Sequence, residues 1–143
     1  MFSNFKSTTM EEKKIDITLT IEQKDDVLVA HLLFFNSSSK KYYLDKYSIC
    51  YNGKFSRNVF SIIDENSKKV DYIGIMAKRN VTPDDFISLE VGESVMTKVI
   101  LNNGYRVKRG MKYNMQYSVY NLDFLRIQDI MLIESNRVEV IYK

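Results

Sequence analysis

Residues 70 to 120 read VDYIGIMAKRNVTPDDFISLEVGESVMTKVILNNGYRVKRGMKYNMQYSVY, and this stretch decides the fold. Runs of strand length, rich in apolar and β-branched residues, alternate in it with short turns that contain Gly, Asn, Asp or Pro. The turns lie at residues 81–85, 91–93, 102–104 and 109–110. This pattern predicts a compact antiparallel β domain.

The preceding residues extend the pattern. From Lys13 to Glu22 apolar residues alternate with polar ones, which is typical of a half-buried strand. The run from Val27 to Phe35 is apolar at odd and even positions, so we expect a central strand covered on both faces. Further strands are expected at residues 42–44, 47–51, 57–63, 70–78, 86–90, 94–101, 112–120 and 138–142, and a loop followed by a strand at residues 123–134.

Short strands at roughly 8–12-residue spacing, without a long segment of helical periodicity, are what two packed antiparallel sheets require. We therefore predict an all-β fold, an immunoglobulin-like antiparallel β-sandwich of about eight or nine strands. A chain of 143 residues is one domain by length. Residues 1–12 are expected to be a flexible N-terminal arm, and residues 13–143 a single β-sandwich domain.

Charge and hydropathy exclude several classes of partner. The net charge of +3 comes from 21 basic and 18 acidic residues, a balance that does not indicate nucleic-acid binding. No run approaches the ~20 apolar residues that a membrane span needs, and the first residues lack the apolar core of a signal peptide. We expect a cytoplasmic protein with no membrane span. The single Cys50 is compatible with a reducing compartment.

Residue counts also argue against a catalytic or metal site. One Cys and one His cannot form the common closed zinc sites, and the sequence has no calcium loop, P-loop, GxGxxG or HExxH pattern. Cys50 and His31 lie in strand patterns, which favours a packed thiol and a hydrogen-bonded core imidazole over a nucleophile and its base. Asp84 and Asp85 follow Pro83, which favours a turn over acid–base chemistry. We expect no enzyme activity, no metal and no cofactor.

Two features of the stretch between residues 105 and 113 are structural in our interpretation. The densest basic patch alternates along a strand and turn, so its side chains are expected to diverge and form a solvated turn. Gly110 followed by Tyr113 resembles the corner of sandwich folds in which a tyrosine hydroxyl bonds to nearby backbone. The basic patch consists of Arg106, Lys108, Arg109 and Lys112, beside Tyr105.

A family resemblance follows from turn and core patterns across residues 55–143. The matching residues are Val70-Asp71-Tyr72-Ile73-Gly74, Lys78-Arg79, Phe86 to Leu89, Gly92-Glu93-Ser94, Tyr105, Gly110, Tyr113 and Ser135 to Val140. They resemble the β-sandwich region that precedes the catalytic domain in deuterolysin-like (aspzincin) metallopeptidases, including the peptidyl-Lys endopeptidases. This sequence has no HExxH helix, so no catalytic residue is carried over. The resemblance implies a module whose relatives lie against a metallopeptidase domain.

We therefore predict a non-catalytic module that binds and restrains a protease, as an inhibitor or as the immunity partner of a metallopeptidase or toxin. Such a sandwich can insert a loop into a cleft or add a strand to an edge. The alternative is a structural or adhesion-type module of a larger assembly that self-associates through sheet edges. The expected contacts are Lys78, Arg79, Asn80, Asp84 and Asp85, where the cations form the tip of a Pro-stiffened loop, and secondly Arg106, Lys108 and Arg109.

Overall fold

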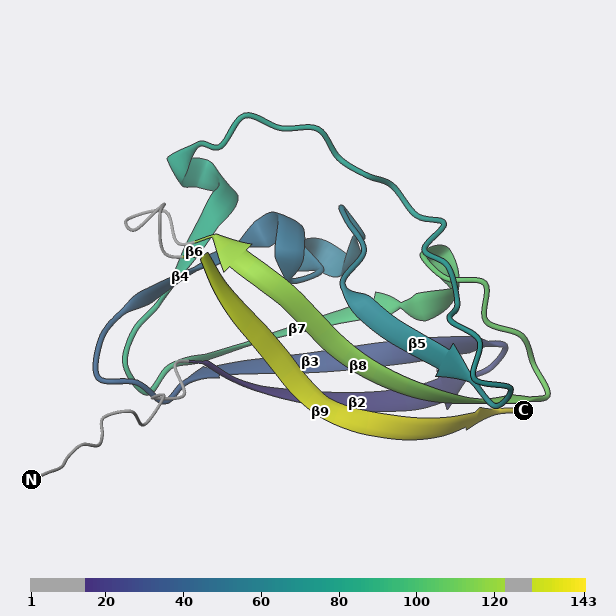
Figure 1. Cartoon of the computed structure of the whole chain (residues 1–143). Coiled ribbons are helices and arrows are strands. Elements are labelled where there is room, and N and C mark those ends of the chain that lie inside the picture. The colour runs from purple at the N-terminus through teal and green to yellow at the C-terminus, as the bar shows by residue number, and fades with distance from the viewer. Residues whose placement is uncertain (1–14, 123–129) are drawn as a thin grey trace, which may run out of the picture.

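The computed structural model describes residues 15–122 and 130–143, so the expected arm at residues 1–12 lies outside the described residues. Eight strands and four short 3-10 helices make up the described chain (Figure 1). The strands are β2 (Ile15–Lys24), β3 (Val27–Asn36), β4 (Tyr42–Asp45), β5 (Phe60–Asp64), β6 (Phe86–Leu89), β7 (Ser94–Ile100), β8 (Met111–Leu122) and β9 (Ile130–Tyr142). The 3-10 helices are η1 (Lys46–Ser48), η2 (Tyr51–Gly53), η3 (Pro83–Asp85) and η4 (Leu101–Asn103).

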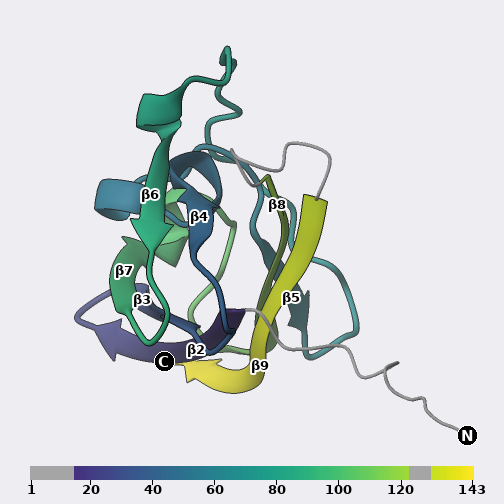
Figure 2. The ribbon, with the colours of Figure 1, turned by 90° about the vertical axis from the view of Figure 1, so that its left-hand side faces the viewer.

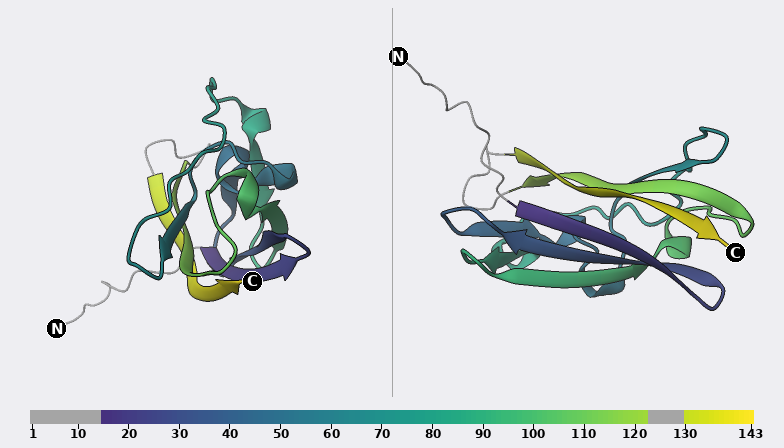
Figure 3. Two further views of the ribbon diagram at one scale, coloured as in Figure 1. Left: turned by 90° about the vertical axis from the view of Figure 1, so that its right-hand side faces the viewer. Right: turned by 90° about the horizontal axis from the view of Figure 1, so that it is seen from below.

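The strands form a β-sandwich, as predicted. A six-stranded sheet has the order β5-β8-β9-β2-β3-β7, and β4 pairs with β6 in a two-stranded sheet. The larger sheet bends so that β2, β3 and β7 lie in one layer and β5, β8 and β9 in the other (Figure 2; Figure 3). Paired strands are antiparallel except β2 and β9, whose parallel contact has the single register pair Ile17 and Ser135.

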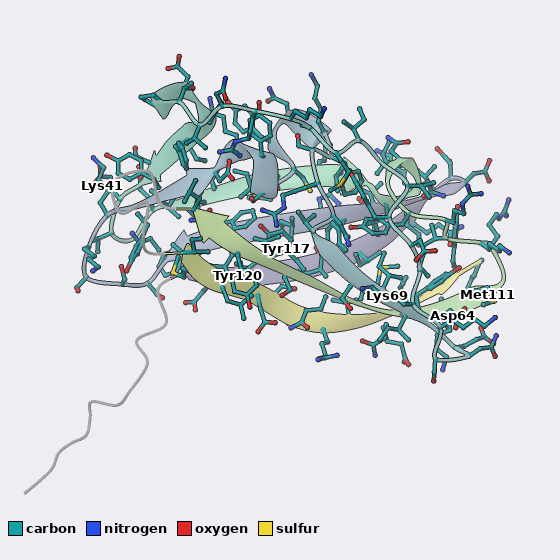
Figure 4. The ribbon with its side chains drawn as sticks, turned by 45° about the horizontal axis from the view of Figure 1, so that its top comes forward. Lys41, Asp64, Lys69, Met111, Tyr117 and Tyr120 are labelled. Carbon is teal, nitrogen blue, oxygen red and sulfur yellow. The ribbon has the colours of Figure 1, made fainter. Side chains whose placement is uncertain are left out.

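The core lies between the two layers and follows the alternation of the strands. On β8 the inward face carries Tyr113, Met115, Tyr117 and Val119, all buried. Tyr117 is fully buried, whereas Tyr120 is 60% exposed on the same strand (Figure 4). The strand predicted at residues 112–120 is therefore confirmed as part of β8.

The outer face of β3 corrects one prediction. Leu32 and Phe34 on its inner face are buried, but Leu33 is only half-buried and Phe35 is 39% exposed. The prediction of a strand covered on both faces is wrong, because β3 has a neighbouring strand on each side but the other layer covers only one of its faces. Its outer face is thus partly open at Leu33 and Phe35, whereas Val29 on the same face is buried.

Two expected strands are absent. Residues 47–51 form η1 and the start of η2, because Asp45 caps η1 by accepting the Tyr47 N–H (3.0 Å) and Cys50 has a left-handed backbone (φ 57°). Residues 70–78 contain only an isolated bridge, from Tyr72 to Tyr105. Their backbone N–H groups bond to three separate segments instead of one strand: Val70 to Ile62, Ile73 to Gly104 and Ala77 to Ser56.

A loop followed by a strand was predicted for residues 123–134. Residues 123–129, the expected loop, lie outside the described residues. Residues 130–134 open β9 and confirm the expected strand. The strand expected at residues 138–142 is present, but as the second half of the continuous strand β9 and not as a separate strand; Tyr142 is buried.

Side-chain amides join β2 to β9 where the backbone ladder is almost missing. Asn136 accepts a hydrogen bond from the Leu19 N–H (2.8 Å) and donates one to the Leu19 carbonyl (3.1 Å). Gln23 accepts from the Lys143 N–H (2.9 Å) and donates to the Lys143 carbonyl (2.8 Å). Each side-chain amide thus bonds to the N–H and the carbonyl of one residue, as the backbone of a neighbouring strand would. These hydrogen bonds connect the two layers.

A buried asparagine joins the small sheet to β8 in the same way. Asn121 accepts from the Asp45 N–H (3.0 Å) and donates to the Tyr43 carbonyl (3.0 Å). Asn36, also buried, donates to the Leu89 carbonyl (2.8 Å) and so fixes the end of β6. These amides position Asp45 and β6, which flank the candidate site.

Two tyrosines stabilise the loops. The Lys108 N–H donates to the Tyr113 hydroxyl (2.7 Å), which confirms the predicted tyrosine corner. The Tyr105 hydroxyl accepts from the N–H groups of Val59 (3.1 Å) and Phe60 (2.9 Å) and donates to Asn58 Oδ1 (2.5 Å). Burial raises the pKa of the Tyr105 hydroxyl above its ordinary value, because the charged form would be poorly solvated there.

Candidate protein-binding site

Residues 73–82, which we call the arch, cross the upper side of the molecule as the teal segment leading to η3 (Figure 1). The arch exposes several large apolar side chains within one short segment: Ile75 is 69% exposed, Met76 68% and Val81 42%. Lys78 is exposed among them. An exposed apolar segment with one cation is typical of a contact surface for another protein.

The start of the arch is fixed by Tyr72. Its hydroxyl donates a hydrogen bond to the Ile75 carbonyl, three residues along the chain. Gly74 makes this possible, because a Cβ atom there would lie 2.6 Å from the Tyr72 hydroxyl. The Ile73 N–H donates to the Gly104 carbonyl (2.8 Å). The backbone is therefore held on both sides of Gly74.

The middle of the arch is held by one backbone bond and one ion pair. The Ala77 N–H donates to the Ser56 carbonyl (2.8 Å). Arg79 Nη1 lies 2.7 Å from Asp45 Oδ1 and 2.8 Å from Oδ2. The side chains of Arg79 and Asp45 are only 15% and 4% exposed, and the Tyr47 ring lies 4.2 Å from the guanidinium carbon. The Arg79 side chain is thus an internal anchor.

The carboxylate of Asp45 is itself fixed from several sides. It accepts hydrogen bonds from the Tyr47 N–H (3.0 Å) and the Ser48 hydroxyl (3.2 Å) in addition to Arg79. These partners hold the buried carboxylate in a position where it compensates the guanidinium. The arch is consequently tied to the end of β4 and to η1.

The end of the arch is closed by η3. The Asp85 N–H donates to the Thr82 carbonyl (3.0 Å), and the Asp85 carboxylate accepts from the Thr82 N–H (2.9 Å). Pro83 is the first residue of η3, where its fixed φ suits the turn. The structural role predicted for Asp85 is confirmed, and the exposed Asp84 makes no ion pair among residues 15–122 and 130–143.

The structure separates the expected contact residues of this loop into two groups. Lys78, Asn80 and Asp84 are exposed, whereas Arg79 and Asp85 are engaged by the scaffold. The expectation of a tip with two cations is corrected, since Arg79 faces Asp45 and Lys78 alone presents its charge to solvent. The apolar members Ile75 and Met76 were missed, because in the sequence they read as part of a strand.

The second expected contact, the basic turn, is exposed at Arg106, Lys108 and Arg109. Arg109 donates to the Lys143 carbonyl (2.9 Å) and pairs with Asp26 (3.1 Å). Its charge is partly compensated within the chain, and no exposed apolar side chain in the described residues accompanies it between residues 104 and 112. The arch is the better developed surface.

Cys50 and His31 lie on opposite sides of a layer. Cys50 belongs to the core, while His31 is half-buried on the outer face of β3 and its Nε2 lies 2.8 Å from Glu22 Oε1. The hydrogen bond from His31 lowers the pKa of Glu22. The packed thiol is confirmed; the imidazole is hydrogen-bonded as predicted, but its placement in the core was wrong.

We expect Cys50 to be unreactive in the folded protein. It is 3% exposed, and burial raises the pKa of the thiol to about 12 from an ordinary value of 9.0. Since the thiolate is the nucleophile, labelling by iodoacetamide at pH 8 should be slower by about two orders of magnitude or more than in urea. Mass spectrometry of timed samples measures this. Equal rates in both solutions would contradict the packed thiol.

Other kinds of site find little support in the described part of the chain. Residues 15–122 and 130–143 contain no group of three or more side chains suited to a metal ion. None of the helices in that part has the length and apolar character needed to cross a membrane. A comparison with models of protein families gives no match for the sequence, and a search of curated proteins gives none either.

Proposed function

We propose that this protein is a non-catalytic binding module that restrains a protease, as an inhibitor or as the immunity-type partner of a metallopeptidase or toxin. The observation that carries the proposal is the arch, which is exposed and yet anchored to the scaffold. The Arg79–Asp45 ion pair and the Ala77–Ser56 hydrogen bond are its central anchors.

Anchoring matters because binding a flexible loop costs conformational entropy for every residue that becomes ordered. The arch is already ordered by its anchors before it binds a partner. Burial of the apolar surface of Ile75, Met76 and Val81 therefore contributes to affinity with a smaller loss of conformational entropy. A loop of this kind fits into the cleft of a protease, where main-chain hydrogen bonds and side-chain pockets read an extended segment.

A pull-down with a matched control tests the proposal. The tagged wild-type chain, the variant Ile75→Asp/Met76→Asp and the variant Ile141→Asp are incubated with lysate of the source cells. Ile141 is 58% exposed on β9, so its variant changes an exposed apolar residue outside the arch. We expect a protease to be captured by wild type and by Ile141→Asp, with at least about tenfold less on the arch variant.

The captured protease is then assayed with purified wild-type chain. Its activity should fall in proportion to the chain added, and the arch variant should leave it unchanged. Equal capture by all three chains would contradict the role of the arch. Capture of no protease would contradict the restraining function itself.

A second candidate is a structural or adhesion-type module that self-associates through sheet edges. The observation that favours it is a groove of about 330 Å³ beside the edge strand β7, lined by Tyr51, Gly53, Met96 and Lys98 among others. Met96 is 68% exposed there. A sedimentation coefficient that rises with protein concentration would support this candidate, provided that Met96→Asp abolishes the rise.

A further inference from the structure

We infer that the arch is bound as a substrate-like segment by a peptidase with an acidic primary pocket, with Lys78 in that pocket and Lys78–Arg79 as the peptide bond presented for cleavage. The inference rests on the proposed function and deepens it, because it identifies the chemistry of the partner's cleft.

The direction of the side chains selects Lys78. Arg79 is directed inward by its ion pair with Asp45, whereas its neighbours Lys78 and Asn80 are exposed. Lys78 takes part in no ion pair among residues 15–122 and 130–143. The ammonium group of Lys78 loses its water when it enters a partner's pocket. That pocket must therefore supply a carboxylate to compensate the charge.

The residues beside Lys78 define the rest of the cleft. Met76 on its N-terminal side and Val81 on its C-terminal side are exposed and apolar. A partner that accommodates them has shallow apolar subsites on both sides of the acidic pocket. Arg79 is excluded from the pocket, because its guanidinium is engaged by Asp45 and covered by Tyr47.

The anchors lie on both sides of this one peptide bond. Ala77 is held through its N–H to Ser56, and Arg79 through its side chain to Asp45. In hydrolysis the oxygen of water bonds to the carbonyl carbon of Lys78, the C–N bond breaks and the nitrogen of Arg79 takes up a proton. Because the anchors hold both new ends in place, the reverse reaction has a high effective concentration. The cut arch therefore stays in the cleft and the peptidase stays occupied.

Trypsin, whose primary pocket is acidic, is the probe for this inference. The full chain is incubated with trypsin, the products are mapped by mass spectrometry, and the remaining activity is measured on a small chromogenic substrate. Within residues 15–122 and 130–143 we expect the first cut after Lys78, two fragments that stay together on a native gel, and inhibition of trypsin. Chymotrypsin, which has an apolar pocket, should be inhibited at least about 30-fold less.

Two variants with exposed substitutions make the result specific. Lys78→Met should weaken the inhibition of trypsin by about 30-fold or more, since it removes the buried charge pair with the pocket. Lys68→Met, on the exposed turn after β5, should leave the inhibition unchanged, because Lys68 lies outside both expected contact regions and takes part in no ion pair among the described residues. A first cut elsewhere in the described residues, or inhibition that Lys78→Met does not reduce, would overturn the inference.

The two proposals fail in different ways. If the pull-down captures a protease through Ile75 and Met76 but Lys78→Met binds it as wild type does, the acidic pocket is wrong and the restraining function stands. If no arch variant affects capture, the protease does not bind through the arch, and both the proposed contact and the inference about Lys78 are wrong.

Discussion

Replacement of Asp45 by asparagine is expected to lower the free energy of unfolding by about 3–5 kcal/mol, the loss typical when one partner of a buried ion pair is removed. The carboxylate is 4% exposed and lies 2.7 Å from Arg79 Nη1. Asparagine keeps the size of the side chain but removes the charge, so the guanidinium is left in a buried site without compensation. Urea unfolding followed by tyrosine fluorescence measures the change.

The same variant should release the arch. Arg79 regains water only when residues 76–82 move away from the scaffold, so limited proteolysis by an enzyme with broad specificity should cut there faster than in wild type. Asp84→Asn is the matched control, because Asp84 is an exposed acid at the end of the arch, and it should stay within about 0.5 kcal/mol of wild type. A stable Asp45→Asn variant with an intact arch would contradict the anchoring role of the ion pair.

Replacement of Tyr105 by phenylalanine is expected to be the second most damaging change, at about 2–4 kcal/mol. The ring and its edge contacts with Phe55 and Phe60 would persist, so packing is preserved. The loss comes from the hydroxyl, because the N–H groups of Val59 and Phe60 would keep no partner in a buried site.

Tyr117→Phe supplies the comparison for this prediction. Its hydroxyl makes a single hydrogen bond, to the Ser48 carbonyl (2.5 Å), and a carbonyl tolerates the loss of one bond better than an N–H does. Tyr117→Phe should therefore lower the free energy of unfolding by only about 1 kcal/mol. If urea unfolding gives the same decrease in the free energy of unfolding for both variants, the decrease is not determined by the number of N–H groups left without a partner.

The parts of the fold that were predictable have strong local patterns. The strand at residues 112–120 and the tyrosine corner at Gly110 and Tyr113 depend on neighbouring residues only, and both were predicted correctly. Residues 47–51 were misread because the left-handed backbone at Cys50 leaves no hydrophobic pattern. Residues 70–78 have the composition of a strand, but their hydrogen bonds go to distant segments that no local rule identifies.

The candidate site shows the same limit. The cap formed by Asp85 is local and was predicted, whereas the inward turn of Arg79 depends on Asp45, which is 34 residues away. A polar residue on an apolar face was an available signal, since Asn121 continues the buried row of β8 and in fact holds Asp45. The sequence could indicate that such an amide has a buried partner, but it could not identify that partner.

The amide junction between β2 and β9 has a consequence for how fast the protein folds. Leu19 and Asn136 are separated by 117 positions, so the layers can close only after a very long loop has lost its freedom. Hairpins such as β2–β3 and β8–β9 need only local closure. Refolding after dilution from urea is therefore governed by this late closure of the sandwich, and weakening the Asn136 amide should slow the final phase while the hairpins form as before.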